Sequence, residues 1–334
     1  INLEMSCIIR SHSYNSYMPE LPEVQTTVNG LNTVLKNHKI TDVWSDYFVN
    51  TASKRLDNIK NKNFFDKFKK EITGTKFIKA ERRGKNILIH LSGPKPSVGR
   101  GKTILIHMKM TGHLLYGTYK RISKSKLQIS NGEKEGWVSE DKKLKDPFNR
   151  FIHFIINFGN GKSLAFSDMR KFAKITLFKT DKMHEHADLK ILGPEADSKL
   201  DWKTLKKQLL KKSKGKIKTV VMDQINVTGS GNTYSDELLW ASGIHPERKV
   251  EKLVNKDIQN ILESTVKILA QSISVGGDSM SDYRNIHGKR GGFQNLHKVY
   301  RRAKQKCLKV DCDGIILRKI IGGRSAHYCS VHQI

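Results

Sequence analysis

The segment KIKTVVMDQINVTGSGNTYSDELLW, residues 216–240, governs the architecture of the C-terminal half of this chain. Two helical patterns, at 217–225 and 233–242, flank a turn at 228–232 that contains two glycines. Glycine lets a backbone come close to an anion, and the N-terminus of the second helix adds the positive end of a dipole. Lys218 and several neighbouring lysines add positive charge. These residues are typical of a phosphate-binding turn, although a plain helical hairpin with a solvated basic face fits them equally well.

The remaining sequence divides into a strand-rich part before this segment and a helical part around it. An apolar stripe predicts a buried first helix that begins at Pro22 and uses Val24, Val28, Leu31 and Leu35. Polar residues 120–145 predict a long solvated loop. Short β-rich runs predict strands at 76–81, 86–91, 103–108, 113–117, 151–157, 163–166 and 173–178, and helical patterns recur at 202–212 and 252–274. The predicted fold is α+β: an N-terminal helix plus antiparallel β-sandwich, then a helical domain.

Length and charge narrow the class of protein. At 334 residues the chain exceeds what one hydrophobic core usually organises, so two domains are expected. Lysine and arginine total 61 against 32 acidic residues, which gives a net charge of +29. Such a chain is attracted to polyanions, unless the charge only reflects a generally basic proteome. No apolar run approaches the roughly 20 residues of a membrane-spanning helix, so we expect a soluble protein with no membrane partner.

The C-terminal cysteines predict a metal site. The pattern Cys307-x4-Cys312-x16-Cys329-x2-His332 offers two close pairs of soft ligands at the ends of a short hairpin. Four such ligands suit one structural zinc ion, although three buried cysteines and a surface histidine are the alternative. Within the hairpin, Arg324 follows a Gly-Gly turn that suits a phosphate clamp. So few cysteines form no disulfide framework, and the first 17 residues lack the apolar core of a secretion signal, so a cytoplasmic location is expected.

The start of the chain carries a candidate nucleophile. Residues 1–17 are interpreted as a leader or upstream translation, with Met18 as an alternative start. If Met18 is removed, Pro19 exposes a secondary amine with a pKa below that of lysine, and Glu20 is adjacent for proton transfer. Within a longer chain, Pro-Glu at a helix start is ordinary capping chemistry.

Four motifs in register resemble the formamidopyrimidine-DNA glycosylase family of base-excision repair. They are Met18-Pro-Glu-Leu-Pro-Glu-Val24, Arg83-Gly-Lys85, Met222-Asp-Gln followed by Gly229-Ser-Gly-Asn-Thr-Tyr234, and the terminal cysteine hairpin. The resemblance covers almost everything from Met18 to the end. It implies a catalytic β-sandwich domain at 18–180 after the leader at 1–17, a linker at 181–200, a helix-two-turn-helix DNA-binding domain at 201–298 and a zinc-finger β-hairpin at 299–334. Leu21 makes the start more similar to the formamidopyrimidine and 8-oxoguanine branch than to the endonuclease VIII branch.

The resemblance also implies an activity. We expect a monomeric bifunctional DNA glycosylase and AP lyase that removes oxidised purines from double-stranded DNA, through a Schiff base on Pro19 followed by β,δ-elimination. The alternatives are a catalytically blocked damaged-DNA-binding protein and an endonuclease VIII-like glycosylase for oxidised pyrimidines. A leader would block this chemistry, because a proline nitrogen in a peptide bond has no nucleophilic lone pair.

Site residues follow by position in the motifs. Pro19, Glu20, Lys85 and Arg324 are implied as catalytic, and zinc would be held by Cys307, Cys312, Cys329 and His332. A wedge that fills the space of an extruded base is implied at Met110, Arg170 and Phe172, although core packing is the alternative for Met110 and Phe172. Further DNA contacts are implied at Lys218, Asn232, Tyr283 and Arg324. Phe151 stands where the family has a DNA-contacting histidine, so that contact is either missing or has moved to Arg150 or His153.

Overall fold

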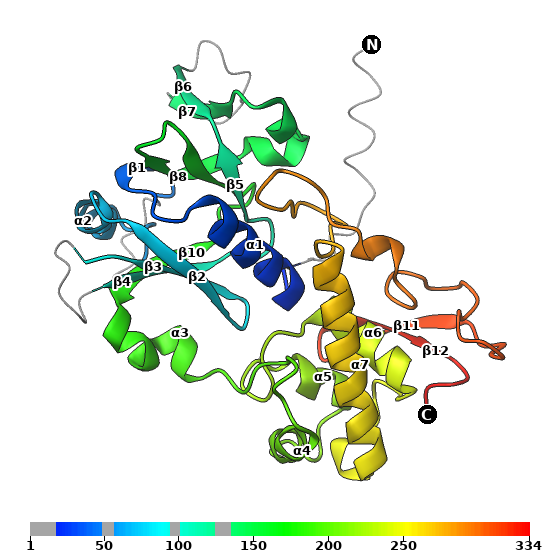
Figure 1. Ribbon diagram of the computed structural model, residues 1–334. Coiled ribbons are helices and arrows are strands. Elements are labelled where there is room, and N and C mark those ends of the chain that lie inside the picture. The colour runs from blue at the N-terminus through cyan, green and yellow to red at the C-terminus, as the bar shows by residue number, and fades with distance from the viewer. Residues whose placement is uncertain (1–17, 49–56, 94–100, 124–134) are drawn as a thin grey trace, which may run out of the picture.

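The N-terminal half is a sandwich of two antiparallel sheets, and a helical domain follows it (Figure 1). The computed structural model describes residues 18–48, 57–93, 101–123 and 135–334. One sheet has the strand order β1-β8-β9-β5 and the other β10-β4-β3-β2. The strands are β1 (Ile40–Ser45), β2 (Phe77–Arg83), β3 (Asn86–Leu91), β4 (Lys102–His107), β5 (His113–Gly117), β8 (Ile152–Phe158), β9 (Ser163–Ser167) and β10 (Lys174–Lys179).

Apolar residues from the facing sides of the two sheets fill the space between them. The core combines Phe154 and Phe166 of one sheet with Ile89 and Ile106 of the other. Helix α1 (Leu21–Val34) turns its whole predicted stripe toward this core. It packs on β2 and also on α7 of the helical domain, so the start of the chain lies at the junction of the two halves.

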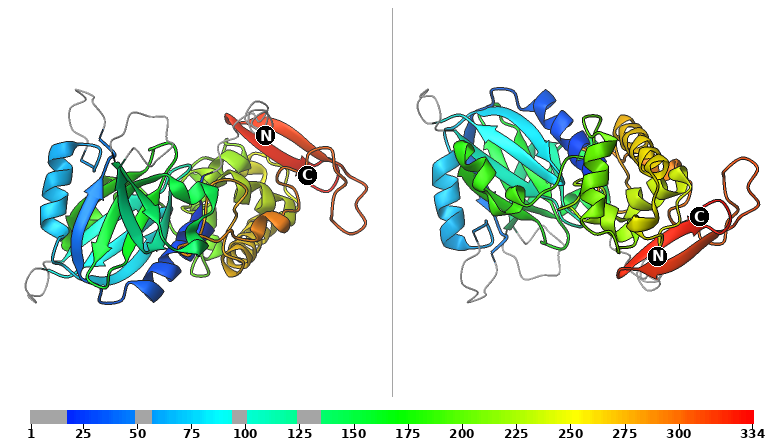
Figure 2. Two further views of the ribbon diagram at one scale, coloured as in Figure 1. Left: turned by 90° about the horizontal axis from the view of Figure 1, so that it is seen from above. Right: turned by 90° about the horizontal axis from the view of Figure 1, so that it is seen from below.

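The helical domain has its own core and carries a β-hairpin at its outer end (Figure 2). Its helices are α4 (Trp202–Leu210), α5 (Ile217–Met222), α6 (Asn232–Ser242) and α7 (Asn255–Ser274). Strands β11 (Ile316–Ile321) and β12 (Arg324–Cys329) form the hairpin, whose two-residue turn is Gly322-Gly323. Both glycines have positive φ, which is the conformation that a tight hairpin turn of this length requires.

The predicted fold class is confirmed, with local corrections. The part of 120–145 that the structure describes is not a bare loop. It contains the paired strands β6 (Tyr119–Ser123) and β7 (Glu135–Ser139) and a short 3-10 turn, because Trp137 packs on Trp44 of the sandwich. The linker region contains a 3-10 turn (Thr180–Glu185) and α3 (Ala187–Lys190), and sequence patterns missed both β1 and α2 (Lys62–Ile72). No helix in the described parts of the chain is both long enough and apolar enough to cross a bilayer.

A segment from the C-terminal half completes the sandwich core. Tyr283 and Ile286 are each 1% exposed and belong to the sandwich cluster rather than to the helical one. The backbone N–H of Tyr116 in β5 donates to the carbonyl of Ile286 at 2.9 Å, and Arg284 pairs with Asp146. The C-terminal half therefore contributes a segment to the sandwich core, although the predicted domain boundaries themselves stay a prediction. The predicted leader at 1–17 lies outside the described residues.

Candidate active site and metal-ligand cluster

A pocket of about 440 Å³ opens where the two halves meet. Four predicted residues that are far apart in sequence line it together: Glu20, Lys85, Asn232 and Arg324. Pro19 is buried between the lining residues Met18 and Glu20. The pocket thus brings together the start of α1, the β2–β3 turn, the α5–α6 turn and the tip of the β11–β12 hairpin.

The α5–α6 turn holds the start of α1 in place. The N–H of Leu21 donates to the carbonyl of Gly229 at 3.0 Å, and Gly229 has a φ of +119°. A Cβ at Gly229 would lie 2.5 Å from Leu21, so glycine is needed for this approach. The turn therefore needs a glycine at position 229 so that the two halves can pack closely against each other.

The Glu20 carboxylate lies on the N-terminus of α6. It accepts the N–H of Gly231, and also that of Thr233 at 3.0 Å. Burial raises the pKa of Glu20, while Lys85 and these two N–H groups oppose the rise. Burial therefore favours the protonated form of this carboxyl group relative to a solvent-exposed glutamate.

Lys85 lies at the tip of the β2–β3 turn, which an acidic clamp holds in place. Glu195 accepts the N–H of Gly84 at 2.8 Å and the guanidinium of Arg83 at 2.7 Å, and it also pairs with Arg82. Burial lowers the pKa of Lys85, whereas Glu20 raises it. The turn therefore presents a lysine next to the acid, at the predicted site.

His107 is a pocket residue that sequence reasoning missed. It ends β4 and lines the pocket, and its Nδ1 accepts the N–H of Lys109 at 3.1 Å. Burial, with Lys109 and Lys85 nearby, lowers the pKa of His107 to about 3, so the ring is neutral and carries its proton on Nε2. The motif His107-Met-Lys-Met-Thr-Gly was the available signal, but only Met110 had been singled out of it.

Asn232 and Arg324 form the opposite wall. Asn232 begins α6, and its Nδ2 donates to Ser325 Oγ at 3.4 Å. Its Oδ1 is buried and has no hydrogen-bond partner among the residues that the structure describes. Arg324 begins β12 and is exposed, so its guanidinium is accessible to an anion.

The predicted wedge residues lie on two adjoining turns outside this pocket. The Arg170 guanidinium stacks over the Phe172 ring at 4.5 Å, and Phe172 is 46% exposed, so core packing does not explain it. Met110 is half-buried. Buried Asp168 joins the turns: it accepts the Thr111 hydroxyl on one side and the N–H of Ala173, at 2.9 Å, on the other. Sequence reasoning missed this supporting role.

Two predicted DNA contacts are contradicted by burial. Lys218 is 0% exposed and pairs with Asp236 at 2.5 Å, so its ammonium does not reach the surface. Tyr283 is 1% exposed, and its hydroxyl donates to the Glu23 carbonyl at 3.1 Å. Arg150 is exposed over the Phe151 ring, and its contact with DNA stays a prediction.

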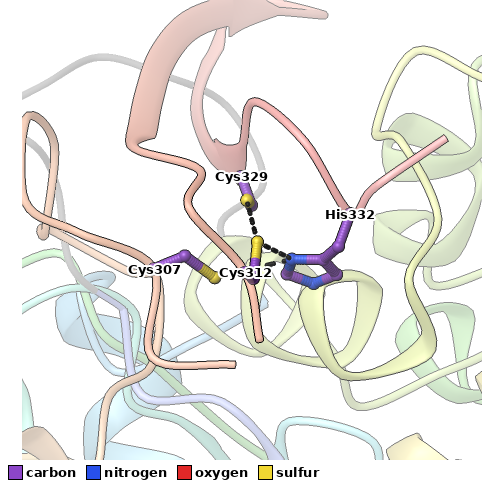
Figure 3. A group of neighbouring side chains, drawn as sticks. All are labelled: Cys307, Cys312, Cys329 and His332. Atoms are coloured by element: carbon purple, nitrogen blue, oxygen red, sulfur yellow. Dashed lines mark hydrogen bonds between the residues drawn. The ribbon is translucent and has the colours of Figure 1, made fainter. Parts of the chain in front are cut away.

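The predicted metal ligands converge on one point (Figure 3). The ligand atoms of Cys307, Cys312, Cys329 and His332 all lie within 4.8 Å of one another. Zinc–ligand bonds of about 2.0–2.3 Å in a tetrahedron place S and S about 3.8 Å apart, and S and N about 3.5 Å apart. The Sγ atoms of Cys312 and Cys329 are 3.6 Å apart, and His332 Nδ1 lies 3.5 Å and 3.7 Å from the Sγ atoms of Cys307 and Cys312. The cluster therefore fits a four-coordinate ion.

Helix α6 supports this cluster from outside. The Trp240 indole N–H donates to Cys307 Sγ at 3.3 Å. The carbonyl of the same residue contacts His332 Nε2 at 3.0 Å, which keeps a proton on Nε2 and leaves the Nδ1 lone pair for a metal. The x4 spacing and the histidine are thus compatible with metal binding.

Comparisons with known proteins agree with this geometry. Residues 18–175 match the formamidopyrimidine-DNA glycosylase N-terminal domain, and residues 192–284 match the H2TH domain of the same enzyme. The formamidopyrimidine-DNA glycosylase of Pelotomaculum thermopropionicum is 31% identical over 95% of this chain and 99% of that protein, and that of Bacillus cereus (strain ATCC 10987) is 32% identical with the same coverage.

Solved structures show the same likeness. Lactococcus lactis Fpg in complex with DNA that contains an abasic site is similar with a TM-score of 0.73 and 28% identity, over 94% of this chain and 99% of that one. MutM in complex with DNA that contains carbocyclic 8-oxo-G gives a TM-score of 0.72 and 27% identity, with the same coverage. This chain therefore belongs to the formamidopyrimidine-DNA glycosylase family.

Proposed function

We propose that this chain is a base-excision repair DNA glycosylase and AP lyase that removes oxidised purines from duplex DNA. The observation that carries the proposal is the pocket itself. It sets an acid with a raised pKa, a lysine with a lowered pKa and an exposed arginine around the buried start of α1. Such a pocket suits the sugar-phosphate backbone of DNA. Its cations attract the phosphates, and its acid can donate a proton close to the nucleophile.

Pro19 is the proposed nucleophile, once it is the first residue of the mature protein. Its amine attacks the sugar C1′, the C1′–N bond to the base breaks, and the base leaves with a proton. The C1′–O4′ bond then opens, with a proton taken up by O4′, and leaves a Schiff base in the form of an iminium ion between Pro19 and C1′. This cation acidifies the C2′ proton, so that elimination follows at the 3′ and then the 5′ phosphate. We assign to Glu20 the proton transfers at the sugar, because it follows Pro19 in the chain, lines the pocket and has a raised pKa.

The cationic wall is proposed to hold the phosphates of the damaged nucleotide. Lys85 and Arg324 supply charge, while the neutral His107 ring donates from Nε2 without adding charge. Asn232 lines the pocket at the first residue of α6, and the positive end of the helix dipole favours anions there. A single chain supplies all four segments that line the pocket, which supports action as a monomer.

A zinc ion in the cluster of three cysteines and one histidine is proposed to have a structural role. Four protein ligands leave no open position for a reacting water. The ion would fix the base of the hairpin whose tip carries Arg324, so its contribution to catalysis is to hold that arginine against the pocket.

Borohydride trapping tests the nucleophile. Protein that begins at Pro19 should form a covalent adduct with an 8-oxoguanine duplex, and Pro19→Gly or the leader-bearing form should lose nearly all of it. Pro22→Gly is the matched control, because it makes the same substitution in the first turn of α1 without touching the amine. Equal trapping by the 334-residue form would overturn the assignment, and trapping on oxidised pyrimidines alone would favour the endonuclease VIII-like alternative. DNA binding without any trapping would favour the catalytically blocked one.

A further inference from the structure

A sealed cluster of charged side chains lies at the junction of α5, α6 and β12. Lys218, Asp236 and His327 are 0%, 1% and 3% exposed. One oxygen of Asp236 accepts from Lys218 Nζ at 2.5 Å. The other accepts the backbone N–H of His327 at 2.9 Å and contacts its ring Nδ1 at 3.0 Å. One carboxylate therefore joins three elements that lie far apart in the sequence.

The cluster does not line the pocket, but each of its elements supplies residues that do. Helix α5 ends at Met222, one turn after Lys218, and α6 begins at Asn232, one turn before Asp236. Strand β12 begins at Arg324, three residues before His327. Any shift of β12 along the helices would move Arg324 relative to Asn232.

The energetics favour a role in geometry over a role in stability. Replacing a buried ion pair with apolar residues of similar volume is often neutral or stabilising, because both charges lose their hydration on burial. The Asp236 carboxylate, in contrast, contacts both the backbone N–H and the ring Nδ1 of His327, and a shift of β12 along the helices would break this pair of contacts. One attested role of buried charged groups is to give specificity to packing, and the contacts of Asp236 with three elements fit that role.

We propose that Asp236 is a positioning residue, which fixes the register of β12 against α5 and α6 and so directs Arg324 into the phosphate pocket. This inference rests on the proposed function. It also gives Lys218 a role: its ammonium neutralises the carboxylate that holds β12, and it makes no direct contact with DNA.

The test is a double-mutant cycle in which the affinity for DNA is measured for each variant. The pair variant Lys218→Met/Asp236→Leu removes both charges together and leaves the net charge unchanged. It should still fold and keep its zinc content, with a lower thermal midpoint because the buried His327 N–H loses its acceptor, and it should bind a duplex with a tetrahydrofuran abasic analogue roughly tenfold more weakly, because a misplaced guanidinium loses its phosphate. Arg324→Ala should weaken binding severalfold in the wild-type background and by less than about twofold in the pair variant, since coupled residues are not additive.

Lys62→Met/Asp66→Leu is the matched control. This pair lies on the surface of α2 in the sandwich, is also neutral in net charge, and should leave both the affinity and the cost of Arg324→Ala unchanged. The proposal is overturned if the pair variant binds like the wild type, or if Arg324→Ala costs the same factor in both backgrounds. Should the pair variant not fold, His327→Phe keeps the backbone N–H, removes only the ring contact and should show a smaller coupling of the same sign; no coupling overturns the proposal. Failure to trap a Schiff base would refute the proposed function instead, while this cycle would still be readable.

Discussion

Gly231→Ala should slow catalysis strongly while the protein still folds. A methyl group at this position would lie 2.5 Å from the carboxyl carbon of Glu20 and 2.6 Å from Lys85 Nζ. The backbone of Gly231 has a negative φ of −137°, so the substitution forces no residue into the left-handed region, and the close contacts are with two side chains.

The distances set the size of the effect. Nonbonded carbon atoms are comfortable at about 3.5–4.0 Å, so Glu20 and Lys85 must retreat by about 1 Å. A misplacement of this size near the reacting groups can cost roughly a hundredfold in rate, or about 2.7 kcal/mol. The cost in stability should be smaller, about 1 kcal/mol, because alanine is a poorer N-cap than glycine for α6.

Single-turnover cleavage of an 8-oxoguanine duplex at saturating enzyme measures the rate, and thermal unfolding measures the stability. Gly159→Ala is the matched control, because a methyl group there meets only Thr41 at 3.8 Å, an ordinary contact. If folded Gly231→Ala protein cleaves at the wild-type rate, the placement of Glu20 and Lys85 against the N-terminus of α6 is not what catalysis requires.

The structure predicts three further effects. Trp240→Phe removes the N–H donor to Cys307 and should raise the zinc dissociation constant roughly tenfold in a chelator competition, whereas Trp44→Phe should leave it unchanged. Phe172→Ala removes about 1–3 kcal/mol of stacking and should slow excision of 8-oxoguanine roughly tenfold, while cleavage of an abasic site, which has no base to extrude, should change little. Burial and Asp278 raise the pKa of Glu23 from 4.5 to about 8, so the native state holds a proton that the unfolded chain has lost. This contribution to stability is complete below about pH 4.5 and is lost as pH rises toward 8, by up to about 1.4 kcal/mol per pH unit; Glu23→Gln should flatten that part of a urea-unfolding profile, and an unchanged slope would contradict the assignment.

Local patterns were sufficient to predict the elements that repeat a simple period. The stripe from Val24 to Leu35 predicts α1, and short β-rich runs predict most sandwich strands, because each of these elements adds a row of apolar side chains to the core. The ligand spacing from Cys307 to His332 also predicts its cluster, since few arrangements satisfy four soft ligands. These features depend on residues that are close in sequence or share a strict chemistry.

Features that arise only from tertiary packing were not predictable. Lys218 looks like a surface lysine in a basic run, and its burial depends on Asp236 and β12, which lie elsewhere in the chain. His107 and Asp168 are likewise defined by what surrounds them, namely the lysines and the turns that fold against them. Residues 120–145 carry so many lysines that the short strands β6 and β7 are hidden in the sequence pattern.

Because Tyr283 and Ile286 occupy the interior of the first half, protein synthesis must be nearly complete before that interior can close. When the ribosome has made only the sandwich strands, the core between the two sheets still lacks Tyr283 and Ile286. These residues are synthesised about a hundred residues after the last sandwich strand. Cutting the gene between its two modules would accordingly give two fragments that need each other, and mixing them should be the way to recover a folded enzyme.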